Sequence, residues 1–270
     1  MCKRPLITLL LSLSTVAASA ISTLDSLLTV LDNEVAHSAQ YCAAHQQRID
    51  SLEAIRPMTK ALQLRIAREY QYFQSDSART RYMALLQSPE PYRTQAYMGL
   101  VQLSSSIGKY GGGMALLENV QEVPDSLRVD WLEAVWRLYN EAAAATQIPK
   151  LRDNLKATAQ IYYDSLLHTM DEQAVHNTAI RLRREMLAAA DAHRPDIALQ
   201  INDTILSRVE VWSHPYAIEA YSRAMLYEQA GEYRKRIEWL TRSAIADVRC
   251  GITDNGSSWL VAKECYESGD

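Results

Sequence analysis

The sequence predicts an all-α fold in which helical hairpins stack into an array, an α-solenoid with degenerate repeats. Hydrophobic residues make up 48% of the 270 positions, which is enough for a substantial core. Apolar side chains recur three or four positions apart through most of the chain, as they do on the buried face of a helix. Only 9 glycines occur, none of them between Met114 and Ala230, so long helices are favoured over many tight turns.

The first twenty residues have the pattern of a signal peptide. Lys3 and Arg4 give a positive start, an apolar stretch runs from Leu6 to Val16, and Ala18-Ser19-Ala20 matches a cleavage site. The apolar stretch is shorter than the ~20 residues that span a bilayer. We therefore predict that residues 1–20 are removed and that the protein is exported, to the periplasm.

Residues 21–57 predict one long amphipathic helix, weakest between His37 and Gln47. Leu24, Leu28 and Leu31 fall on one of its faces, and Pro57 ends it because proline disfavours the helical conformation in the residue before it. Residues 58–270 predict a repeat domain. Prolines, glycines and polar breaks delimit its expected helices, which are 59–73, 75–86, 92–107, 114–120, 125–145, a helix that begins at Pro149, 173–190, 195–208, 215–229, 232–248 and 257–267.

A glycine-rich segment, GKYGGG, occupies Gly108–Gly113. Bare backbone amides at a helix N-terminus can bind phosphate, which makes a phosphate loop one interpretation. However, no strand precedes the segment, and no Lys-Ser or Lys-Thr pair follows its last glycine. We predict a flexible turn between two helices.

The repeat is clearest around Gly231. Ala224 and Tyr227 lie on one face of a first helix, Gly231 permits a left-handed turn, and Tyr233 begins the apolar face of a second helix. These small, aromatic and glycine positions are typical of a tetratricopeptide-like repeat, whose period is ~34 residues.

Two other glycines extend the array. Gly269 lies 38 residues after Gly231, and Gly108 marks an earlier, degenerate unit. Arg236 departs from the pattern, because it stands where the repeat usually has alanine. We expect the last hairpin to be incomplete, with an uncovered apolar face that would need a partner or a continuation of the chain.

Charge and cysteine content limit the ligands. Removal of residues 1–20 takes away two basic residues and no acids, so the net charge changes from −4 to −6. This acidic balance argues against a nucleic-acid surface, and we predict no nucleic-acid partner. Of the three remaining cysteines, Cys250 and Cys265 could form a disulfide, or all three, including Cys42, could be small buried side chains.

The sequence contains no persuasive active site. His37, Cys42 and His45 form its only dense group of metal-ligating residue types, but the four ligands that zinc requires are not present. The patterns H-E-x-x-H, G-x-S-x-G and Cys-x-x-Cys do not occur. We predict that the chain is not an enzyme and needs no metal or cofactor.

Several segments resemble, in order along the chain, a Bacteroidetes family of tetratricopeptide-containing regulatory proteins. They are LDSLLTVLD (Leu24–Asp32), R-I-x-x-L (Arg48–Leu52), EYQYFQSDSARTRY (Glu69–Tyr82), YYDSLL (Tyr162–Leu167) and SAIADVRCGITDNGSSW (Ser243–Trp259). The resemblance implies an exported helical-repeat sensor, one transmembrane helix and a cytoplasmic helix-turn-helix that binds DNA. Only LVAKECYESGD follows Trp259, so we expect a truncated gene product or an excised sensor region.

Two functions are consistent with these observations. The first is a periplasmic sensing module of a membrane-anchored transcriptional regulator, which binds a protein or peptide on its concave face. Ile218, Tyr221, Met225 and Glu228 would face that groove, although Tyr221 and Met225 could instead pack against the neighbouring repeat. The alternative is a stand-alone exported scaffold for the assembly of cell-envelope complexes.

Overall fold

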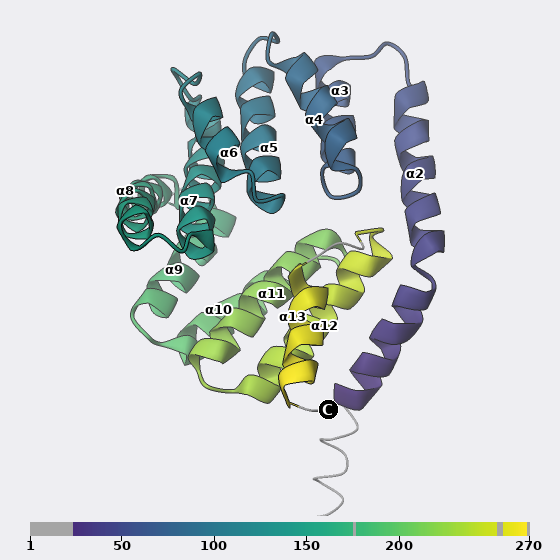
Figure 1. Ribbon diagram of the computed structural model, residues 1–270, viewed down its shortest axis with the longest axis vertical. Helices are drawn as coiled ribbons and strands as arrows, with labels where there is room; N and C mark the ends of the chain where they lie inside the picture. The colour runs from purple at the N-terminus through teal and green to yellow at the C-terminus, as the bar shows by residue number, and fades with distance from the viewer. Residues whose placement is uncertain (1–23, 175–176, 253–255, 269–270) are drawn as a thin grey trace, which may run out of the picture. The chain divides into compact units, whose positions relative to one another are not determined.

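The computed structural model describes residues 24–174, 177–252 and 256–268, and the helices within them confirm the all-α fold (Figure 1). No strand occurs in these ranges. The predicted signal peptide at 1–20 and Gly269 lie outside them. The elements are a helix at residues 24–36, α2 (Ser38–Ala54), α3 (Lys60–Gln71), α4 (Ser75–Leu85), α5 (Tyr92–Ser106), α6 (Tyr110–Leu117), the 3-10 helix η1 (Asp125–Leu127), α7 (Arg128–Ala145), α8 (Pro149–Ala174), α9 (Thr178–Asp191), α10 (Pro195–Leu206), α11 (His214–Gln229), α12 (Tyr233–Arg249) and α13 (Gly256–Ser268).

The chain divides into two compact units, which we describe separately. Unit 1 consists of Met1–His45 and Glu185–Asp270, and unit 2 consists of Gln46–Arg184. None of the described helices is both long enough and apolar enough to cross a membrane.

Unit 2 is a series of three hairpins, α3/α4, α5/α6 and α7/α8. The first helices contact one another in order, α3 with α5 and α5 with α7, as stacked repeats require. Thr59 caps α3 by accepting a hydrogen bond from the Leu62 amide at 3.2 Å. The core includes Tyr82 of α4, whose hydroxyl donates to Gln71 Oε1 at 2.5 Å and whose ring lies where a Cβ on Gly99 of α5 would be. Glycine at position 99 therefore allows α4 and α5 to approach closely.

The prediction of a flexible turn over Gly108–Gly113 was wrong, because α6 begins at Tyr110 and contains three of the four glycines. The turn is confined to Gly108, whose φ is 70°, and to Lys109, whose amide donates to the Ser104 carbonyl at 2.8 Å. Packing against α7 explains the last glycine, since a Cβ on Gly113 would come within 2.9 Å of Leu138 Cδ1. Close helix packing thus favours a helix despite the low helix propensity of glycine.

The predicted helix over 173–190 was also misplaced at its start. Residues 173 and 174 end α8, which is 26 residues long, and α9 begins at Thr178. The Asn177 side chain explains the start of α9, because its Oδ1 accepts hydrogen bonds from the amides of Ala179 at 3.0 Å and Ile180 at 3.2 Å.

Alignment on glycine does not find the α9/α10 hairpin, whose turn lies in unit 1. His193 has a φ of 53°, and Gly231, 38 residues later, has a φ of 73°. The backbone bonds are the same in both turns, since the Arg194 amide donates to the Ala189 carbonyl and the Glu232 amide to the Tyr227 carbonyl, each at 2.9 Å. The α9/α10 and α11/α12 hairpins are therefore successive repeats with a period of 38 residues.

The helix at residues 24–36 packs against the last helices of unit 1 (Figure 1). Leu31 is 8% exposed and belongs to the same core cluster as Leu240 of α12 and Val261 of α13. The sequence predicts one long helix over 21–57, weakest between His37 and Gln47, and an uncovered apolar face on the incomplete last hairpin. In the structure the helix is interrupted at His37, and its first part covers apolar surface of α12 and α13.

Polar contacts reinforce this packing. The Glu34 carboxylate accepts hydrogen bonds from Arg249 of α12 at 2.5 Å and from the Tyr41 hydroxyl. His45 Nδ1 lies 2.9 Å from the Cys250 carbonyl oxygen. The bond from Arg249 opposes the effect of burial and, with the bond from Tyr41, lowers the pKa of the Glu34 carboxyl, so this pair stays charged at neutral pH.

The three residues that the sequence groups as possible metal ligands, His37, Cys42 and His45, do not converge in the structure. His37 Nδ1 bonds to the Asn33 carbonyl, Cys42 Sγ lies 3.8 Å from the Gly251 carbonyl oxygen, and His45 contacts Cys250. Within the described ranges, no three His, Cys, Asp or Glu side chains are placed to hold a metal ion. Cys42, Cys250 and Cys265 are all half-buried and none of them is in a disulfide, so the structure has neither the Cys250–Cys265 disulfide nor three fully buried cysteines.

Candidate partner-binding face

The four residues predicted to bind a partner lie on α11, at spacings of three and four. The helix starts at a cap, where the Ser213 hydroxyl accepts a hydrogen bond from the Tyr216 amide at 3.3 Å, and Pro215 fits its first turn. The opposite side of α11 is buried; it contains Tyr216, Ala217, Ala220, Ala224 and Tyr227. Burial of that side leaves Ile218 and Tyr221 of the predicted stripe exposed to solvent.

The four predicted residues differ in exposure. Ile218 is 41% exposed and Tyr221 is 38% exposed, so both present large side chains to solvent. Met225 is half-buried and packs against the core cluster that contains Leu31 and Val261, which leaves it less surface for a partner. The structure therefore favours Ile218 and Tyr221 over Met225 as contact residues.

Glu228, the fourth predicted residue, lies beside a buried arginine. Its Oε2 is 3.6 Å from the Nε of Arg236, and the guanidinium of Arg236 also pairs with Glu264 of α13. The Arg236 side chain is only 8% exposed, so this pair of contacts joins α12 to both first helices. This arrangement accounts for arginine at a position where the repeat usually has alanine.

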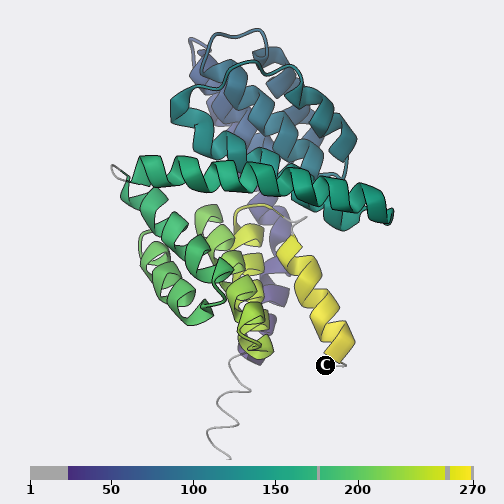
Figure 2. The same cartoon turned by 90° about the vertical axis from the view of Figure 1, so that its left-hand side faces the viewer.

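Two exposed aromatic residues on α13 continue the stripe, and sequence reasoning missed both. Trp259 is 64% exposed and Tyr266 is 88% exposed. The 38-residue period places Trp259 at the repeat position of Tyr221 and Tyr266 at that of Glu228. The same period applied to the predicted stripe is the signal that would have found them. We call the surface formed by Ile218, Tyr221, Trp259 and Tyr266 the aromatic face. Figure 2 shows α13 from a second side.

A buried polar network fixes α11 beneath the aromatic face. Arg223 of α11 donates to Asp203 Oδ1 at 2.5 Å and to Asn202 Oδ1 at 3.3 Å, and its guanidinium lies 4.6 Å from the centre of the Trp239 ring. Asn202 is fully buried and donates to Glu219 Oε2 at 3.2 Å. These contacts link α10, α11 and α12, so the exposed residues of α11 stand on a rigid support.

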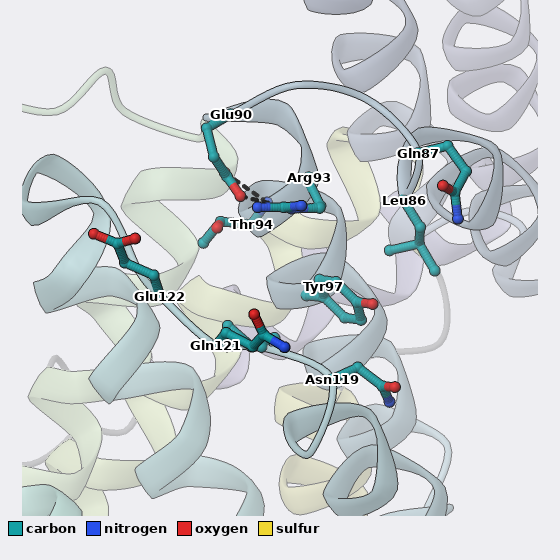
Figure 3. Close-up of a pocket in the computed structure, with 10 residues that line it drawn as sticks. Leu86, Gln87, Glu90, Arg93, Thr94, Tyr97, Asn119, Gln121 and Glu122 are labelled. Atoms are coloured by element: carbon teal, nitrogen blue, oxygen red, sulfur yellow. Dashed lines mark hydrogen bonds and ion pairs between the residues drawn. The ribbon is translucent and has the colours of Figure 1, made fainter.

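Unit 2 contains a separate polar pocket of about 250 Å³ beside the start of α5 (Figure 3). The Glu90 carboxylate points toward Arg93 and Thr94; it accepts from Arg93 Nε at 2.8 Å and from the Thr94 amide at 3.2 Å. Burial of Glu90 opposes ionisation, but the bonds from Thr94 and Arg93 lower the pKa of its carboxyl. Glu90 and Arg93 already pair with each other, and Glu90 also binds an amide at the start of α5. The pocket is therefore a weaker candidate for ligand binding than the aromatic face.

A family model described as the SusR N-terminal TPR domain matches residues 35–270 of the chain. The match confirms the resemblance to tetratricopeptide-containing regulatory proteins and agrees with the helical hairpins of both units. Tetratricopeptide repeats generally mediate protein–protein interaction and form non-catalytic scaffolds. Comparison with curated proteins and with solved structures gives no match.

Proposed function

Because the chain belongs to the family of SusR N-terminal TPR domains, we propose that it is the exported sensor region of a membrane-anchored transcriptional regulator. The family description, which assigns the repeats to the N-terminal part of a longer protein, supports this proposal. The signal-peptide pattern at residues 1–20 supports a periplasmic location. In this proposal the repeats bind a protein or peptide ligand, and a following segment carries the response across the membrane.

The aromatic face of unit 1 is the proposed ligand-binding surface, and its exposed Trp259 and Tyr266 are the observation that carries the proposal. Large side chains exposed singly are common, but here the exposed Tyr221 and Trp259 occupy equivalent repeat positions of two first helices. Trp and Tyr are enriched among the residues that dominate binding energy, because they combine large apolar area with a polar atom. Each is expected to contribute at least 1 kcal/mol on truncation.

Unit 1 also suggests how binding is transmitted. α13 carries Trp259 and Tyr266 on its exposed side, while Val261 packs in the cluster with Leu31 of the helix at residues 24–36. A ligand on the aromatic face would therefore contact α13, and the other side of α13 packs against the helix at residues 24–36. We propose that occupancy stabilises α13 against this cluster and so biases the segment that follows it.

Site-specific photo-crosslinking in cells tests the binding surface. A benzoylphenylalanine residue introduced at Tyr221 or Trp259 should crosslink to one defined protein or peptide of the periplasm. Tyr233, which is 63% exposed on α12 of the same unit, is the matched control and should not crosslink to that partner. Equal crosslinking from Tyr233, or crosslinks from none of the three positions in cells that carry the intact regulator, would overturn the assignment of the face.

A further inference from the structure

Unit 2 has an apolar groove that is lined by residues of α4, α5 and α6 and of the turn between α5 and α6. α5 contacts both α4 and α6 and lies between them (Figure 1). The groove has a volume of about 250 Å³. Its apolar lining includes Leu100 and Leu103 of α5, which are buried, and Met83 and Ile107, which are 49% and 43% exposed.

Gly112 of α6 keeps this groove open. A Cβ placed on Gly112, which lines the groove, or on Gly111 would meet no atom within 4 Å. Larger side chains at these positions would extend into the space beside α6. Packing of unit 2 does not require glycine at either position, whereas Gly113 contacts α7. Of the two, only Gly112 lines the groove, and it leaves the apolar surface there accessible despite the low helix propensity of glycine.

Two basic side chains line the groove and give it a charge preference. Arg79 comes from α4 and Lys109 from the residue before α6, and no acidic residue lines the groove. Neither side chain is in an ion pair or a side-chain hydrogen bond in the part of the chain that the structure describes. The full chain has a net charge of −4, so a basic apolar groove contrasts with the general charge of the protein.

We propose that this groove binds a partner peptide in which large apolar side chains are flanked by carboxylates. The volume is below the ~300–1,000 Å³ of small-molecule sites and suits one or two apolar side chains of a peptide. Arg79 and Lys109 would pair with the flanking carboxylates, which sets the orientation and makes binding sensitive to salt. This second site lies in unit 2 and does not depend on the aromatic face of unit 1.

Fluorescence anisotropy with labelled decapeptides and the whole chain tests the proposal. The probe is a peptide with two leucines flanked by aspartates; its controls replace the aspartates with lysines or the leucines with serines. The acidic leucine peptide should bind with a micromolar Kd, and both controls should bind at least tenfold more weakly. Equal binding of the lysine peptide, or binding of none of the three, would overturn the proposal.

Variants locate the binding to the groove. Gly112→Leu should fill the groove and weaken binding at least tenfold, while Gly111→Leu, equally open but outside the lining, should leave the Kd unchanged. Circular dichroism would verify that both variants stay helical. Arg79→Glu should weaken binding of the acidic peptide and strengthen that of the lysine peptide. If Gly112→Leu instead abolishes a concentration-dependent dimer, a second copy of the chain occupies the groove and the proposed partner is wrong.

Discussion

Replacing Leu31 with alanine should loosen the helix at residues 24–36 from the rest of unit 1. Leu31 is 8% exposed and packs in the cluster with Leu240, Ile245 and Val261. The substitution removes apolar groups worth ~0.8 kcal/mol per methylene and leaves a cavity, so the expected loss of stability is about 2–4 kcal/mol. Such a loss raises the population of the detached helix by roughly 30- to 1,000-fold, since ~1.4 kcal/mol is a tenfold change.

Hydrogen exchange followed by mass spectrometry measures this effect directly. Amides of the helix should exchange faster in Leu31→Ala by the factor given above, while amides of unit 2 should be unchanged. Val35→Ala is the matched control, because Val35 is 50% exposed in the same helix and its loss should change stability by no more than ~0.5 kcal/mol. If the two variants exchange alike, the helix does not pack as the structure describes and the reasoning fails.

Four further substitutions test local features, each by urea unfolding of the whole chain. Gly99→Ala should lower the free energy of unfolding by about 1–3 kcal/mol, because its methyl group would overlap the buried ring of Tyr82. Gly111→Ala should raise it by ~0.5–1 kcal/mol, because the added methyl group meets no atom and alanine favours the helix. Equal effects of the two substitutions would contradict the packing of α5. Glu34→Gln should cost about 1–2 kcal/mol at pH 7 through the lost bond to Arg249. The pKa of Glu34 in the folded protein lies below its ordinary value of 4.5, so the difference in unfolding free energy between wild type and Glu34→Gln is fully present above pH 4.5. It should vanish as the pH falls through the folded pKa. A difference that persists in acid would refute the charge pairing. Gly231→Ala should cost ~1 kcal/mol, since its φ of 73° is unfavourable for residues with a Cβ; an unchanged urea midpoint would show that the turn is not left-handed.

Part of the candidate site could be read from the sequence. Ile218 and Tyr221 follow from the repeat around Gly231, because helix periodicity alone separates the buried side of α11 from its exposed side. Trp259 and Tyr266 required the 38-residue period, which became firm only when the left-handed turn at His193 matched that at Gly231. Single-helix periodicity gives no sign that a histidine replaces glycine in such a turn.

The sequence by itself determined the local architecture. Apolar spacing, prolines and the glycines at 108 and 231 predict helical hairpins, and the motifs along the chain identify the family. These features depend on contacts between residues within one hairpin. Such residues are close in the sequence, so helix periodicity and the turn are enough to bring them together. They do not depend on what lies elsewhere in the chain.

Tertiary structure decided the rest. Leu31 and Glu34 pack against α12 and α13 more than 200 positions away, and such contacts are set by the shape and charge of surfaces that form only after the hairpins stack. In the same way Gly113 is helical because α7 approaches α6, and Arg236 is buried because Glu264 of the next helix meets it. Periodicity can specify which side of a helix is apolar, but it cannot specify which distant element will cover it.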